Sequence, residues 1–138
     1  MDCSSTRHSR GDLSLADDLE RTLEAFFDGQ ALAGELFAAL QGMIGALGSL
    51  ELRVTKSQVA FRRRRAFAWA WMPGKILRGR TAPLVLSLAL PERDPSPRWK
   101  QVVEPAPGRF MHHLELYTTA DLDEQVAVWL RRAWEAAG

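Results

Sequence analysis

The sequence predicts an α+β fold: a mostly antiparallel sheet of four to five strands with two N-terminal helices and one C-terminal helix. Three observations predict it. Apolar residues recur at spacings of three and four up to about residue 47. Between Leu50 and Tyr117 the period changes to two, which is typical of strands. The helical spacing returns from Leu122. Helices grouped at the two ends of a run of strands are typical of α+β domains.

The first 12 residues contain no periodic apolar positions and predict a disordered tail, which leaves residues 13–138 as a single α+β domain. Ser14 is a suitable N-cap for a first helix, which Gly29 should end. A second helix is expected from about residue 31 to residue 47, with Gly48 at its end.

The strands begin at Leu50 and include an unusual run of four arginines, residues 62–65. We expect a hairpin that turns near Arg63 and Arg64, because one uninterrupted strand over residues 58–72 would be unusually long. Alternation after the run predicts two faces. Phe67, Trp69 and Trp71 should share one of them, and Ala66, Ala68 and Ala70 should share the other.

Residues 84–90 predict a central strand whose leucines all face one way. Ser96 followed by Pro97 resembles a helix start, so a short helix is expected over residues 97–104, inserted before the last strand at residues 109–117. Asp121 with Glu124 resembles a capping box that opens the final helix.

Composition indicates an ordinary globular protein, with 46% hydrophobic and 25% charged residues. The only cysteine, Cys3, excludes an internal disulfide and favours a reducing compartment. No apolar run approaches the roughly 20 residues of a membrane helix, and the start lacks the apolar core of a signal peptide. We therefore expect a cytoplasmic location and no membrane partner.

Charge is distributed unevenly along the chain. Residues 1–48 contain three basic and eight acidic side chains, whereas residues 49–115 contain thirteen basic and five acidic ones. Residues 116–138 contain two basic and four acidic side chains. The basic middle either binds an anion or is compensated by the acidic helices that pack over it.

Three segments resemble those of a known family. They are residues 54–61, residues 83–91, and residues 109–113 followed by the capped terminal helix. Together they resemble an uncharacterised bacterial domain-of-unknown-function family (DUF-5655 type), over about residues 18–137. The resemblance implies a single compact α+β domain. It implies no activity and supplies no catalytic residues.

The leading functional hypothesis is a non-enzymatic module that binds an anionic ligand: a nucleic acid, a nucleotide-like metabolite or an acidic protein. Cationic side chains would attract the ligand and aromatic rings would stack on it. The candidate ligand-binding residues are Lys56, Arg62, Arg64, Trp69, Trp71, Arg98, Trp99 and His113, with Lys75, Arg78 and Arg80 as further cations. The competing interpretation places the tryptophans in the core and pairs the arginines with acidic side chains.

Two further classes of function stay open. A small enzyme would use Lys56, Ser57 and His113 in a cleft at the sheet edge. A homodimeric interaction domain would use the aromatic strand, and the chain is expected to be a monomer or a homodimer. His112 and His113 should point to opposite faces of a strand, so they predict no shared metal ion. We expect no cofactor, no metal and no catalytic residue.

Overall fold

The computed structural model describes residues 18–75 and 80–138, and it divides the chain into two compact units, residues 1–31 and 32–138. In the first unit, residues 18–26 form a helix that ends in a turn where Gly29 has a φ of 72°. The predicted tail over residues 1–12 and the predicted helix start at Ser14 lie outside the described residues, as do residues 76–79, which include the predicted cation Arg78.

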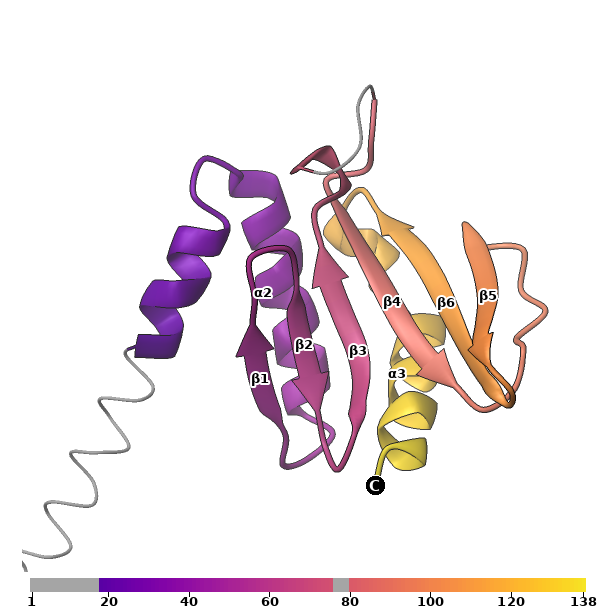
Figure 1. Cartoon of the computed structure of the whole chain (residues 1–138). Helices are drawn as coiled ribbons and strands as arrows, with labels where there is room; N and C mark the ends of the chain where they lie inside the picture. The colour runs from indigo at the N-terminus through magenta and orange to yellow at the C-terminus, as the bar shows by residue number, and fades with distance from the viewer. Residues whose placement is uncertain (1–17, 76–79) are drawn as a thin grey trace, which may run out of the picture. The chain divides into compact units, whose positions relative to one another are not determined.

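The second unit is a six-stranded antiparallel sheet with two α-helices on one face (Figure 1). The strand order in space is β1-β2-β3-β4-β6-β5. The elements are α2 (Ala31–Gly45), β1 (Glu51–Val54), β2 (Val59–Arg62), β3 (Ala66–Trp71), β4 (Leu84–Leu90), β5 (Gln101–Ala106), β6 (Arg109–Leu116) and α3 (Glu124–Ala136). The core between helices and sheet is apolar, and it includes the four leucines of β4, at residues 84, 86, 88 and 90.

The sheet has six strands rather than the expected four to five, because the helix predicted over residues 97–104 is wrong. Residues 101–106 instead form β5, which pairs with the outer edge of β6. Val102 and Val103 are β-branched and favour a strand. Pro97 lies in a short turn, where the Ser96 hydroxyl accepts a hydrogen bond from the Arg98 backbone N–H. Ser96 and Pro97 resemble a helix start in sequence, but the hydrogen bond to the Ser96 hydroxyl stabilises only a turn.

The hairpin predicted at the arginine run is confirmed, with β2 and β3 on either side of residues 63–65. A β-bulge changes the predicted faces. Phe61 pairs with Ala68 and Arg62 pairs with Ala66, so Phe67 is an extra residue without a partner on β2. The bulge turns Phe67 toward the helices, where 1% of its surface is exposed, and it places Ala66 on the face of Arg62.

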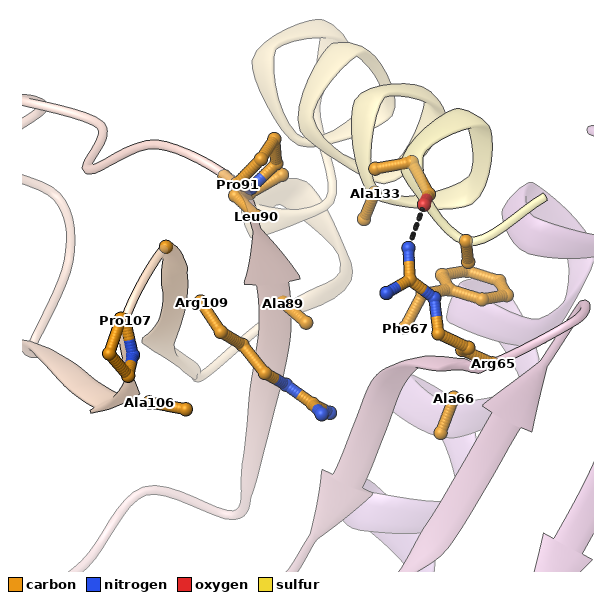
Figure 2. A pocket seen from close by; sticks show the side chains of 13 residues that line it. Arg65, Ala66, Phe67, Ala89, Leu90, Pro91, Ala106, Pro107, Arg109 and Ala133 are labelled. Atoms are coloured by element: carbon orange, nitrogen blue, oxygen red, sulfur yellow. Dashed lines mark hydrogen bonds between the residues drawn. The ribbon is translucent and has the colours of Figure 1, made fainter.

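The arginine hairpin caps the C-terminal end of α3. Arg63 donates to the Trp134 carbonyl at 3.1 Å, and Arg65 donates to the Ala136 carbonyl at 2.7 Å (Figure 2). The backbone N–H groups of Arg64 and Arg65 both donate to Ala137. The last carbonyls of a helix lack intrahelical donors and carry partial negative charge, so guanidinium groups stabilise them. The last turn of α3 itself contains no basic residue, and we conclude that the hairpin supplies the charge instead.

Trp134 is held between the arginine hairpin and the segment after α2. The Arg63 guanidinium lies 3.6 Å from the centroid of its ring. On the Gly48 side the fit is tight, because a Cβ at Gly48 would lie 2.8 Å from the ring, and Gly48 has a φ of 151°. Both facts require glycine at this position.

Asp94, in the connection between β4 and β5, accepts hydrogen bonds from three side chains. The Trp99 indole donates to one carboxylate oxygen at 3.1 Å. The Trp129 indole and the Arg132 guanidinium donate to the other, at 3.2 and 3.1 Å. The Asp94 backbone N–H donates to Nε2 of His112, which is fully buried. Burial alone would raise the pKa of Asp94, but the Ser96 backbone N–H, which donates to the carboxylate at 3.0 Å, and the three side-chain donors together lower it below the usual value.

The start of α3 lies two residues after the predicted Asp121. Asp123 is the N-cap, and its side chain accepts from the Val126 backbone N–H at 3.1 Å. Asp121 instead accepts from the backbone N–H groups of Tyr117 and Thr118, at 2.8 and 3.1 Å. Its carboxylate therefore fixes the turn after β6 and does not cap α3.

The arginine run offers a matched mutational series. We expect Arg63→Ala and Arg65→Ala each to lower the free energy of unfolding by about 0.5–1 kcal/mol, because each removes donors from the negative end of α3. Arg64→Ala should change it by less than about 0.5 kcal/mol, since that exposed side chain makes no hydrogen bond or ion pair within the described ranges. Urea unfolding followed by circular dichroism measures all three. Equal losses at the three positions would contradict the capping role.

Asp94→Ala should lower the free energy of unfolding by about 3 kcal/mol, because two indole N–H groups and a guanidinium lose their acceptor beside the core. The Asp94 side chain is 12% exposed, so water cannot fully replace the carboxylate. Urea unfolding of this variant, with the exposed neighbour Glu92→Ala as the control, tests the expectation. A loss no larger than that of the control would show that the three bonds contribute little.

Candidate functional site

A row of cross-strand neighbours crosses the sheet face opposite α2 and α3, which we call the open face. The register pairs residues one strand at a time along this row. The row runs Arg53, Ala60, Trp69, Ser87, His113, Gln101, with one residue from each strand. Directly opposed residues lie on the same face, so the register places a cation, an indole, a hydroxyl and an imidazole in line.

A shallow groove of about 320 Å³ lies at the centre of this row. Trp69 and Trp71 of β3 form one side of it, and Met111 and His113 of β6 lie across β4 from them. Its remaining lining comes from Ser87 and from Ser57 and Gln58 of the turn between β1 and β2. Both tryptophans are half-buried, so part of each indole is accessible from the groove.

A chain of hydrogen bonds fixes the polar groups of the groove. The Trp71 indole donates to the Ser87 hydroxyl at 2.9 Å, and the same hydroxyl lies 2.7 Å from Nδ1 of His113. Ser87 is 3% exposed, so its hydroxyl proton requires an acceptor, and Nδ1 is the one within reach. Nδ1 therefore accepts, and the ring proton of neutral His113 is on Nε2. Nε2–H has no partner among the described residues.

His113 is held in its neutral form. Burial lowers the pKa of the imidazole below its usual value, and the neighbouring His112 lowers it further. The Trp71 ring stands edge-on to the imidazole, with centroids 6.3 Å apart. At neutral pH the groove therefore presents a hydrogen-bond donor at Nε2 rather than a positive charge.

Three of the predicted ligand-binding residues, Trp69, Trp71 and His113, line this groove, and Lys56 lies beside its rim. Lys56 is exposed in the turn next to Ser57. The sequence placed these residues far apart along the chain, and the pairing of β3 with β4 and of β4 with β6 brings them together.

Arg62 and Arg64 lie away from the groove, around the hairpin that caps α3. The Arg62 guanidinium is 3.7 Å from the carboxylate of Glu51 on the neighbouring strand. Both arginines line a separate surface depression together with Trp134. Their charges therefore lie at the end of the sheet where α3 terminates, outside the groove.

Arg98 and Trp99 lie between the sheet and the first turns of α3. Arg98 forms an ion pair with the N-cap Asp123 at 2.9 Å, and this bond lowers the pKa of that carboxyl group. Trp99 is 8% exposed and stacks on Trp129, with ring centroids 4.1 Å apart. Through these contacts, both side chains attach the segment between β4 and β5 to α3.

Of the six residues in the row, only Trp69 and His113 were predicted from the sequence; Arg53 and Ser87 were not, nor were Ala60 and Gln101. Alternation along each strand placed Ser87 opposite the leucines of its strand, but a single polar residue there gave no functional signal. The missing information was the order of strands in space. Arg53 is two strands, about 10 Å, from Trp69 on the same face.

Within residues 18–75 and 80–138, no group of three or more His, Cys, Asp or Glu side chains is placed to hold a metal ion. None of the helices in these ranges is both long and apolar enough to cross a membrane.

Protonation of the two histidines should destabilise the fold. The pKa values of His112 and His113 are lowered, so the unfolded chain binds protons more readily than the folded chain. Their contribution to stability is complete above about pH 6.5 and declines as the pH falls below that value. We expect urea midpoints to fall between pH 7.5 and 5.5, and to fall less in His113→Gln. Met111→Leu removes no titratable group, so its urea midpoint should change with pH as that of the wild type does. If the midpoint of His113→Gln changes with pH as much as that of Met111→Leu, the expectation is wrong.

Comparison with protein families gives a match over most of the chain. The sequence model of a family described as a domain of unknown function (DUF5655) matches residues 23–137. No curated protein and no solved structure matched the chain. The match extends from the first described helix through the six strands to the end of α3, and includes every residue of the groove. The chain therefore belongs to the DUF5655 family of domains of unknown function.

Proposed function

We propose that this domain is a non-enzymatic binding module whose open-face groove holds a small anionic molecule with a planar ring, of the kind that nucleotides exemplify. The observation that carries the proposal is the hydrogen-bonded series Trp71–Ser87–His113 in a groove flanked by a second tryptophan. Among the described residues, Nε2 of His113 has no hydrogen-bond partner.

Stacking is the first contribution to binding. Trp69 and Trp71 lie two residues apart on one strand and face the same groove. A planar ring placed against an indole gains stacking energy that depends little on its substituents. The groove volume of about 320 Å³ suits one ring with its attached group better than a run of stacked bases. We therefore favour a metabolite over a nucleic acid strand.

Polar recognition is the second contribution. His113 Nε2–H donates, and the side chains of Ser57 and Gln58 add further donors and acceptors at the other end of the groove. Lys56 and Arg53 are exposed on the β1 side and attract the anionic group. Neither of them forms an ion pair with another described residue. A ligand with a hydrogen-bonding ring and a negatively charged substituent matches both ends of the groove.

The enzyme alternative is favoured by one observation, because Ser57 and His113 line the same groove. Two features favour binding over catalysis. The Nδ1 atom of His113 already accepts from Ser87, and the described residues contain no hydrogen bond between the Ser57 hydroxyl and the imidazole. A nucleophile and its base are expected within hydrogen-bond reach of each other. The homodimer alternative and the cytoplasmic location stay predictions.

Isothermal titration calorimetry of the full chain tests the proposal. The probes are the four nucleoside 5′-monophosphates, adenosine, and a single-stranded oligonucleotide. We expect at least one monophosphate to bind saturably, adenosine to bind more weakly, and the affinity to fall with added salt because charge attraction is screened. Trp69→Ala should weaken binding roughly tenfold through lost stacking.

Two variants complete the design. His113→Ala should weaken binding as Trp69→Ala does, whereas the exposed Arg131→Ala on α3 should bind as the wild type. If only the oligonucleotide binds, with a steep salt dependence, the ligand class is nucleic acid rather than a metabolite. If none of the probes binds, or if both groove variants bind as tightly as the wild type, the proposal is wrong.

A further inference from the structure

A second cavity lies where β3 and β4 separate, next to the C-terminal end of α3. The pairing of these strands ends at Ala68 and Leu88, although β3 begins at Ala66 and β4 continues to Leu90. The bulge at Phe67 lies at this end of β3. The cavity is about 340 Å³, close to the volume of the open-face groove, and it shares no lining residue with that groove.

Small side chains leave this cavity unfilled. Ala133 and Ala136 of α3 and the C-cap Ala137 line it on the helix side, and Ala66 and Ala89 line it on the sheet side. Phe67 and Leu90 add apolar surface. A short apolar group of a ligand bound in this cavity would therefore contact apolar side chains from both α3 and the sheet.

Two arginines enter the cavity from opposite walls (Figure 2). Arg65 comes from the hairpin that caps α3, and Arg109 comes from the first position of β6. Arg65 uses one of its five N–H donors on the Ala136 carbonyl. Arg109 forms no hydrogen bond or ion pair through its side chain in the described part of the chain.

The residues that line the cavity include no acidic side chain. The carboxylate of Glu104, on β5, accepts from the Gly108 backbone N–H at 3.1 Å. Glu135 of α3 is exposed and is not part of the lining. Two guanidinium groups that face one cavity repel each other, and an anion between them would convert that repulsion into attraction.

We propose that this cavity binds a small organic anion, whose carboxylate or phosphate group lies between Arg65 and Arg109 and whose short apolar part packs against the alanines of α3. Guanidinium groups bind both oxyanions through paired N–H donors. No planar ring is required, and the residues involved are separate from Trp69 and His113, so this site stands independently of the open-face groove.

Two-dimensional ¹H–¹⁵N NMR of the full chain, titrated with sodium butyrate or with inorganic phosphate, tests the proposal. Sodium chloride at the same ionic strength is the reference. We expect saturable shifts at the amides of Arg65, Ala89 and Arg109, without shifts at Ser87 or His113. Saturation by butyrate alone assigns a carboxylate with an apolar part, and saturation by both assigns a general oxyanion site.

The matched variants are Arg109→Gln and Arg131→Gln. Arg109→Gln should weaken binding at least tenfold without unfolding the chain, since that exposed side chain makes no contact that the fold requires. Arg131→Gln removes an equally exposed charge outside the cavity and should leave the affinity unchanged. The proposal is overturned if neither anion shifts these amides beyond chloride, or if Arg109→Gln binds as tightly as the wild type.

Discussion

The connection after β4 is fixed to the sheet and to α3 by the Asp94 carboxylate and its backbone N–H. Trp99, Trp129 and Arg132 donate to the carboxylate, and His112 of β6 accepts from the N–H. A carboxylate that is 12% exposed is costly to bury unless such donors surround it. Because these bonds hold α3, which packs on β4 and β3, they also determine where the end of α3 meets the arginine hairpin and the second cavity.

The arginine run shows why a charge pattern does not identify its partner. Four consecutive arginines suggest a polyanion, yet two of them bind the terminal carbonyls of α3 and Arg62 lies beside Glu51. Helix carbonyls carry only partial charges and have no sequence signature. Two other cations lie near the proposed sites: Arg53 is on the open face two strands from Trp69, and Arg109 lines the second cavity together with Arg65. The sequence does not distinguish Arg53 or Arg109 from other surface charges.

Local periodicity predicted the elements well where each had a strong pattern. The strand at residues 84–90, the hairpin at the arginine run and the terminal helix are confirmed. The helix predicted over residues 97–104 is wrong because Ser96 and Pro97 form a turn, and the free edge of β6 then pairs with residues 101–106. The predicted faces fail at Ala66 and Phe67, since a bulge adds one residue and shifts the alternation.

The sequence by itself determined the α+β class, every strand segment except β5, and the alternation that puts Trp69 and Trp71 on one face of β3 and separates His113 from His112 on β6. The tertiary structure decided which strands are neighbours, because pairing between distant strands depends on backbone hydrogen bonds that every residue type except proline can both donate and accept. The order β3-β4-β6 brings the tryptophans to His113 through Ser87, and it leaves Arg98 and Trp99 between sheet and helix.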